Sequence, residues 1–147
     1  MKGGESMERL SVEMLLPHRG RWLLLDEIIG VEHNFLVAKK TFTEKECEGH
    51  FPQVVPGHLI CEALAQAAAS LVSLKQPEVR DKKFFLAETE AKFLQPVEVN
   101  IEIILQVSLK KQKAIKWLRF YFFEGEARVQ DKVIARWKGS GSIYCCK

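Results

Sequence analysis

The sequence lacks an apolar run long enough to cross a membrane. Its 147 residues are 47% hydrophobic, enough for one domain with a core, but no run approaches the roughly 18 apolar residues of a membrane span. The opening segment MKGGESMERL lacks the apolar centre of a secretion signal. We therefore expect a cytoplasmic protein without a membrane partner, with a flexible N-terminal segment over residues 1–9 and a single domain over residues 10–147.

Cysteine patterns for disulfides and metals are missing as well. The four cysteines are Cys47, Cys61, Cys145 and Cys146, and no two are spaced as C-x-x-C. The last two are adjacent, which is a poor framework for a structural disulfide. This use of cysteine fits a reducing compartment and predicts no zinc site.

A strong charge bias is absent. Lys and Arg number 22 against 19 Asp and Glu, which gives a formal net charge of +3. That excess is too small for the dense basic stripe of a nucleic-acid-binding protein, so no nucleic-acid partner is expected. A mildly positive surface would still attract an acidic partner at long range.

No internal repeat, low-complexity tract or linker interrupts the chain. A short helix is expected to begin near Ser11 and to stop at Pro17. The main helix is expected over residues 57–74, where alanines and larger apolar residues cover more than one face. Such a helix should lie inside the fold rather than on top of it.

Strands account for most of the remaining chain. Two are expected before the main helix, over residues 22–31 and 33–42, and four after it, over residues 84–97, 98–110, 114–125 and 126–144. In the segment 98–110, Val99, Ile101, Ile103 and Leu105 alternate with their neighbours as in a half-buried strand. Hairpin turns are expected at KKQK (110–113) and EGEA (124–127). This order predicts an α+β fold in which an antiparallel sheet wraps a central helix.

The stretch EGHFPQVVPGHLICEALAQ, residues 48–66, contains the candidate chemistry. His58, Glu62 and Gln66 are spaced i, i+4 and i+8, so they share one helix face. A carboxyl in an apolar helix needs partners, and desolvation favours its protonated form, which is the form that a general acid needs. Gln66 can donate a hydrogen bond to Glu62 from one turn away. The plainer interpretation is a glutamate at the mouth of a helix groove, paired with a lysine.

A second histidine, His50, lies in the GHFP turn. Gly49 permits an unusual backbone angle there and Pro52 restricts Phe51 to extended geometry, so the turn can hold the imidazole in one orientation. Imidazole titrates near neutral pH and is a good general base. The plainer interpretation is a turn histidine that caps a carbonyl. His18 and His33 are assigned to turns without a chemical partner.

Gly57 is expected at the start of the main helix. Unpaired N–H groups and the positive end of the helix dipole can polarise a carbonyl oxygen there, and glycine leaves room for a substrate. Pro56-Gly57 is equally ordinary helix-start chemistry. A base, an acid and a carbonyl-polarising amide together suit removal of a proton next to a carbonyl and loss of a β-hydroxyl as water.

The order LLPHRGRWLLLDEI, GHFP, PGHLICEALAQ and FFLAETEAKFLQPV resembles the β-hydroxyacyl-acyl-carrier-protein dehydratases of fatty acid synthesis, a hotdog-fold family, over roughly residues 10–140. The specific part is GHFP joined to PG-x-L-x-x-E-A-x-A-Q. The resemblance implies a long helix wrapped by a curved antiparallel sheet. Compared with the family, this chain has a shorter connection from Pro52 to Pro56, and it has His58 in place of a small apolar residue.

The resemblance also implies an assembly and a substrate. The assembly is a homodimer, or a trimer of dimers, in which each site takes its histidine from one subunit and its glutamate from the other. The substrate is a (3R)-3-hydroxyacyl thioester carried on acyl carrier protein, and the product is the trans-2-enoyl thioester. Neither a metal nor a redox cofactor is implied.

Roles for individual residues follow from the same resemblance. His50 would take the C2 proton, and Glu62 would protonate the leaving hydroxyl. Gln66 would hold Glu62, and the Gly57 N–H would bind the thioester oxygen. The substrate-binding set is completed by Phe51 and His58.

Two other activities stay open. A hotdog thioesterase could use Glu62 to activate water, although GHFP favours the dehydratase. A non-catalytic hotdog subunit could bind acyl carrier protein without turning over its cargo. Release of free thiol would indicate the first, and tight binding without turnover the second.

Overall fold

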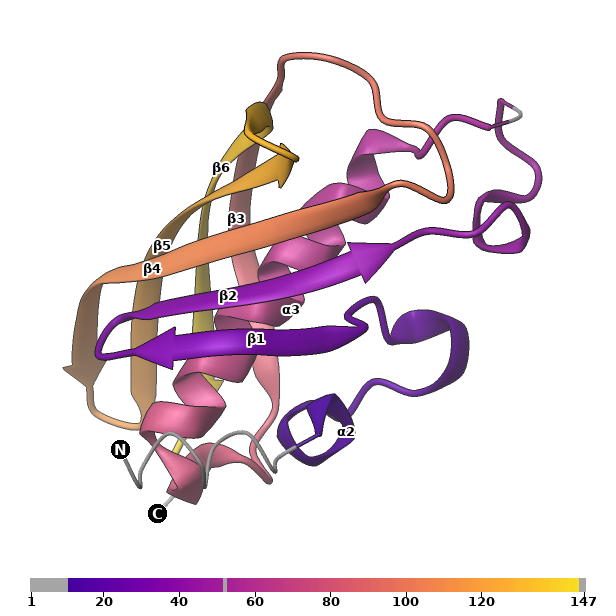
Figure 1. Cartoon of the computed structure of the whole chain (residues 1–147). Coiled ribbons are helices and arrows are strands. Elements are labelled where there is room, and N and C mark those ends of the chain that lie inside the picture. The colour runs from indigo at the N-terminus through magenta and orange to yellow at the C-terminus, as the bar shows by residue number, and fades with distance from the viewer. Residues whose placement is uncertain (1–10, 52, 146–147) are drawn as a thin grey trace.

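The computed structural model describes residues 11–51 and 53–145, in which one long helix lies against one six-stranded antiparallel sheet (Figure 1). The order in the sheet is β1-β2-β4-β5-β6-β3. The strands are β1 (Glu27–Glu32), β2 (Phe35–Thr41), β3 (Phe84–Phe93), β4 (Glu102–Ile115), β5 (Leu118–Val129) and β6 (Lys132–Tyr144). The sheet curves around the helix α3 (Gly57–Lys75), which confirms the predicted α+β arrangement.

Helix α3 forms where the sequence predicted it. Its alanine-rich centre favours helix and allows close approach of the strands. Leu64 and Leu71 are 1% and 0% exposed, and burying each contributes about 1.5–3 kcal/mol. By length and composition α3 could span a membrane, with a mean hydropathy of 1.3, contrary to our expectation that no run approaches this length. However, 61% of that window is buried inside the fold, as in a core helix.

The core lies between α3 and the inner face of the sheet. Alternate residues of β2, β4 and β5 point toward the helix and are fully or almost fully buried: Leu36, Ala38, Ile103, Leu105, Val107, Tyr121, Phe123 and Ala127. The prediction was wrong for Ile101, which is 40% exposed. Strand β4 begins only at Glu102, and Asn100 before it has a left-handed φ of 67°.

The hairpin turns lie elsewhere than predicted. KKQK belongs to β4 and EGEA to β5, and the chain reverses at residues 116–117 and 130–131 instead. Lys116 and Gln130 take φ values of 53° and 56°, as two-residue hairpin loops require. Neither turn contains glycine, so the usual signal is missing from the sequence.

The segment before β1 also differs from the prediction. The expected strand over residues 22–31 starts only at Glu27, after the 3₁₀ turn η1 (Gly20–Trp22). Leu24 and Leu25 are buried, but the Leu24 N–H donates to the side chain of Gln66 rather than to a strand. The short helix α2 (Val12–Leu15) forms as expected, with Ser11 as its N-cap residue. The predicted flexible segment, residues 1–9, lies outside the described residues.

The two edges of the sheet are β1 and β3. Strand β3 is paired only with β6, and eight of its ten residues are exposed. Phe85, Leu86, Phe93 and the following Leu94 are 45–50% exposed, which is unusual for large apolar side chains so close together. This edge is therefore an apolar surface with unpaired backbone groups.

Candidate active site

Glu62 projects from the second turn of α3 and is held by Gln66, as predicted. Gln66 Nε2 donates to Glu62 Oε2 at 3.0 Å and to the carbonyl of Trp22 at 2.7 Å. Gln66 Oε1 accepts from the Leu24 N–H at 2.8 Å. The amide is 1% exposed, and its three hydrogen bonds fix which end faces Glu62. The Glu62 side chain itself is 38% exposed, so a single chain does not provide the burial that was predicted.

The sequence analysis missed His18. It was assigned to a turn without a partner, but His18 Nε2 lies 3.7 Å from Glu62 Oε2. His18 and Glu62 are far apart in the sequence but close in space, because α2 and the following turn pack beside α3. The only sequence signal was that LLPHRG belongs to the same family pattern as the helix. His58, expected beside Glu62, is exposed and has no hydrogen bond or ion pair within the described residues.

A cavity of about 110 Å³ opens beside Glu62. Its polar lining residues are His18, Glu62, Gln66, Ser73, Arg80 and Lys82. Most of the other lining side chains are apolar and come from α2, α3, β3, β6 and the turns after α2 and α3: Leu15, Leu16, Ala65, Ala69, Val72, Val79, Phe84, Leu86 and Ile143. A few convergent polar groups in an apolar wall are typical of a small-molecule site. The cavity therefore suits an apolar chain whose reactive end reaches Glu62.

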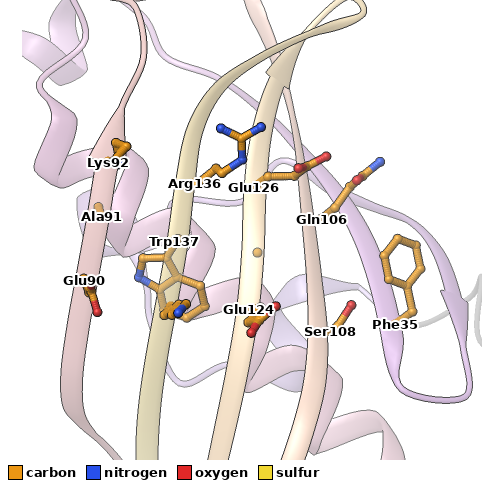
Figure 2. Close-up of a pocket in the computed structure, with 12 residues that line it drawn as sticks. Phe35, Glu90, Ala91, Lys92, Gln106, Ser108, Glu124, Glu126, Arg136 and Trp137 are labelled. Atoms are coloured by element: carbon orange, nitrogen blue, oxygen red, sulfur yellow. The ribbon is translucent and has the colours of Figure 1, made fainter.

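A larger hollow of about 540 Å³ lies on the opposite face of the sheet. Figure 2 shows acidic and basic side chains spread over its strands, with Glu90 and Lys92 on β3, Glu124 on β5 and Arg136 on β6, while α3 lies behind the sheet. This hollow is wide and open, and it contains none of the predicted catalytic residues. The smaller cavity is the better candidate because it combines enclosure with Glu62.

His50 lies in an exposed turn of the connection between β2 and α3. Figure 1 shows this connection at the right of the molecule. Gly49 takes a φ of +91°, the left-handed angle predicted for it. The backbone N–H of His50 donates to the carbonyl of Cys47 at 3.2 Å. The imidazole ring meets the Phe51 ring edge-on, with 5.1 Å between the two centroids. Phe51 is 72% exposed. Pro52 lies outside the described residues, so its predicted effect on Phe51 stays a prediction.

A buried cation supports the turn that carries His50. Lys40 is only 4% exposed, and its Nζ contacts Glu46 Oε2 at 2.7 Å and Asp26 Oδ1 at 3.3 Å. Glu46 belongs to the 3₁₀ turn η2 (Lys45–Cys47), which immediately precedes the GHFP turn. Burial alone would raise the pKa of Glu46, but hydrogen bonds from Lys40 and the Thr43 N–H hold that pKa below its ordinary value.

The short connection from Pro52 to Pro56 is fixed to a neighbouring segment. Val54 forms an isolated β-bridge with Glu98, the Val55 N–H donates to Val97 at 2.8 Å, and the Val99 N–H donates to Gln53 at 3.0 Å. Gln53 takes a left-handed φ of 67°, which lets so short a segment turn. The connection is thus ordered by backbone hydrogen bonds.

Gly57 begins α3, as predicted, but the space beside it is filled. A Cβ added at Gly57 would lie 2.8 Å from the ring of Phe93 on β3. Glycine is therefore needed for the approach of this aromatic ring as well as for the start of the helix. We expected open room for a substrate beside Gly57, and this prediction was wrong because the ring of Phe93 occupies that space.

One chain does not bring the predicted base and acid together. Within the described residues, no hydrogen bond or ion pair joins His50 to Glu62. His50 is exposed in a turn outside the sheet, whereas Glu62 faces the cavity between α2, α3 and β3.

Comparison with known proteins places these features in context. The family model described as a FabA-like domain matches residues 16–138. A protein of Anaeromyxobacter dehalogenans named 3-hydroxyacyl-[acyl-carrier-protein] dehydratase FabZ is 43% identical, with 89% of this chain and 90% of that protein aligned. Its namesake from Coxiella burnetii is 38% identical, with 88% of this chain and 94% of that protein aligned.

Solved structures resemble the fold at lower identity. The dehydratase heterocomplex ApeI:P from Xenorhabdus doucetiae contains a chain with a TM-score of 0.77 at 21% identity, covering 94% of this chain and 93% of that one. An uncharacterised protein from Pyrococcus horikoshii has a TM-score of 0.64 at 14% identity, with 85% of each chain covered. At these identities the likeness concerns the fold.

Proposed function

The chain belongs to the FabA-like family, has the hotdog fold and is a 3-hydroxyacyl-[acyl-carrier-protein] dehydratase, and we propose that His50 is its base and Glu62 its acid. The geometry that supports these roles is the cavity beside Glu62, where a carboxyl held by Gln66 faces a mostly apolar wall. His50 comes to this cavity from a second chain.

The proposed chemistry is a balanced elimination of water. The imidazole of His50 removes the C2 proton of a (3R)-3-hydroxyacyl thioester, and the electron pair of that C–H bond forms the C2=C3 double bond. The C3–O bond breaks as the carboxyl proton of Glu62 passes to the departing hydroxyl, which leaves as water. The Gly57 N–H, at the positive end of α3, polarises the thioester oxygen while charge develops on it. The proton on His50 then returns to Glu62 for the next cycle.

The other members of the predicted site have supporting roles. Gln66 holds one oxygen of Glu62 through a contact seen in the structure. Phe51, whose ring touches that of His50, would cover the thioester end of the substrate. His58 is exposed at the start of α3, where it would meet the carrier-borne part of the substrate rather than Glu62. No metal or redox cofactor takes part in this proposal.

We propose that the working unit is a homodimer, alone or within a trimer of dimers. The separation of His50 from Glu62 within one chain supports this, because each site then needs two chains. The exposed edge of β3, with Phe85, Leu86 and Phe93 half exposed, offers backbone and apolar surface for pairing with a second copy.

The substrate of this reaction class arrives on acyl carrier protein, which is the partner we propose. We place the reaction in the cytoplasm, and we propose residues 10–147 as the single domain that carries it. Neither a nucleic acid nor a membrane is part of this proposal.

The direct test measures two possible products, enoyl thioester and free thiol, in the same sample. A conjugated enoyl thioester absorbs in the ultraviolet, and a thiol reagent reports hydrolysis. We expect enoyl thioester without free thiol, and a loss of about 10²–10⁴-fold in kcat for Glu62→Gln. Free thiol without enoyl product would indicate a thioesterase. Tight binding of the acyl carrier without either product would indicate a non-catalytic subunit. Either outcome contradicts the proposed roles of His50 and Glu62.

A further inference from the structure

We propose that His18 is a positioning residue for Glu62, which holds one carboxyl oxygen so that the other carries the proton delivered to the substrate. The inference rests on the proposed function and deepens it. It starts from the position of His18 Nε2, 3.7 Å from Glu62 Oε2. Gln66 Nε2 donates to the same oxygen at 3.0 Å. Two nitrogen atoms from different parts of the chain therefore face one oxygen of the acid.

The surroundings of the two ring nitrogens determine where the proton of His18 lies. Its Nδ1 is buried and has no hydrogen-bond partner in the described part of the chain, so it stays unpaired in either neutral tautomer. The choice therefore rests on Nε2, which faces Glu62 Oε2. A proton on Nδ1 would turn the lone pair of Nε2 toward the carboxylate. A neutral imidazole carries one N–H, and the geometry assigns it to Nε2, where it points at Glu62.

This arrangement distinguishes the two oxygens of Glu62. An oxygen that faces two N–H donors is a poor place for an acidic proton, because its lone pairs are directed at those donors. Oε2 is that oxygen, whereas Oε1 accepts no hydrogen bond from the described residues. The transferable proton therefore lies on Oε1. A separation of 3.7 Å is longer than a hydrogen bond, so the proposed contact requires the half-exposed carboxylate to move closer to the ring.

The backbone around His18 is fixed independently of Glu62. Arg19 Nη1 donates to the carbonyl of Leu16 at 2.7 Å and to the carbonyl of His18 itself at 2.6 Å. Arg19 Nη2 donates to the carbonyl of Glu13 at 2.9 Å. The ring is therefore presented to α3 by a braced turn, and its position does not depend on a flexible loop.

Other charged residues on the cavity wall have different partners. Arg80 Nε donates to the carbonyl of Ser73 at 2.9 Å, and Lys82 Nζ lies 4.0 Å from Asp81. Neither forms an ion pair with Glu62 within the described residues. The lysine partner that the plainer interpretation of Glu62 required is thus replaced by His18.

The test compares two substitutions of nearly equal size. Gln keeps an N–H donor at the end of the side chain, and Leu removes it. We expect His18→Leu to lower kcat about tenfold to a hundredfold, part of what a general acid supplies, with KM changed by less than about twofold. His18→Gln should stay within about threefold of the wild type. His33→Leu, in the exposed β1–β2 turn, is the matched control and should leave both constants unchanged.

A spectrum of the ring nitrogens tests the contact without turnover. In protein labelled with ¹⁵N-histidine, His18 should show a protonated Nε2 and a bare Nδ1, and both signals should move in Glu62→Gln. Leu and Gln variants of equal activity, or a proton on Nδ1, would overturn the role of His18. A wild-type protein that forms no enoyl product would instead overturn the proposed function, and the spectrum would still decide the contact.

Discussion

The two halves of the candidate site are built in different ways. Glu62 projects from a long buried helix and accepts a hydrogen bond from Gln66, which makes two more hydrogen bonds to the backbone of Trp22 and Leu24. His50 projects from an exposed turn that follows η2, whose Glu46 pairs with the buried Lys40. The contacts that hold Glu62 lie within one chain, whereas in our proposal His50 meets its reaction partner on another.

This difference indicates what each half depends on. The position of Glu62 follows from the packing of α3, so it should survive changes elsewhere in the molecule as long as the core is intact. The position of His50 depends on a turn and on the buried charge beside it, and its role depends on the dimer that we propose. Substitutions in the two halves should therefore have different effects, some on activity and others on stability.

The largest expected effect comes from dividing the site between two inactive proteins. His50→Ala and Glu62→Ala should each lower kcat by about 10²-fold or more. Mixed after subunit exchange, they should regain about a quarter of the wild-type activity, because half of the dimers are then mixed and each has one intact site of two.

The control for this experiment is the double variant His50→Ala/Glu62→Ala exchanged with wild type. It also forms mixed dimers, but neither site in those dimers is intact. On exchange the activity of this mixture should therefore fall from about half to about a quarter of wild type, which the remaining wild-type homodimers supply, whereas a site within one chain would leave it at half. Exchange verified by mass spectrometry without recovery in the first mixture would contradict a shared site.

In the half of the site that contains Glu62, the expected effect is a loss of stability. Gln66→Leu leaves the buried Leu24 N–H and the Trp22 carbonyl without partners. We expect a loss of about 2–4 kcal/mol in the free energy of unfolding, measured by urea denaturation. Ser70→Ala, a buried hydroxyl on the same helix that donates only to the Gln66 carbonyl, should cost about 1 kcal/mol. Equal losses in the two variants would show that the Gln66 network does not hold residues 22–24.

In the half of the site that contains His50, the substitution with the clearest expected effect is at Lys40. Lys40→Met leaves Glu46 and Asp26 without their cation, and these carboxylates are 28% and 42% exposed, so water compensates in part. We expect a loss of about 1–3 kcal/mol, below the range for a fully buried pair, together with a lower kcat because the turn loosens.

Lys39→Met is the matched control for Lys40→Met. The Lys39 side chain is 35% exposed and pairs with Glu27 and Glu102 on the surface. Its loss should leave both the free energy of unfolding and kcat nearly unchanged, because surface ion pairs are screened by water. If the two lysine variants have the same kcat, the turn does not need its buried cation.

The smallest effect is a pH dependence. The pKa of Glu46 is lower in the folded chain than its ordinary value of 4.5. Its stabilising contribution is therefore complete above that ordinary value and is lost as the pH falls through the folded pKa. Glu46→Gln should thus destabilise the protein at pH 7 and have less effect at pH 3.5, as measured by urea midpoints. A difference that grows on acidification would contradict the lowered pKa.

The sequence was sufficient for the helix half and insufficient for the rest. Alanine-rich helix propensity and the spacing of Glu62 and Gln66 are local, so α3 and their hydrogen bond followed directly. His18 lies 44 positions before Glu62, and only the docking of α2 beside α3 brings it there. No local pattern encodes such a contact.

Strand boundaries failed for a related reason. The turns at residues 116–117 and 130–131 place Lys116 and Gln130 at positive φ, where glycine or asparagine is usual. The long pairing of β4, β5 and β6 fixes these turns from outside. Likewise, the composition of residues 23–25 predicts a strand, but the Leu24 N–H donates to the buried amide oxygen of Gln66 instead of to a neighbouring strand.

The open edge of β3 has a consequence for how the protein is made and stored. A strand edge without a partner accepts any extended chain, so a newly folded copy is exposed to the wrong neighbour until it meets the right one. Glu88, Glu90 and Lys92 put charges along this edge, which slows indiscriminate association. Because pairing obeys the law of mass action, dilution should reduce activity per chain once the dimer dissociates. Each subunit would then lose its neighbour's half of the site before it loses its own fold.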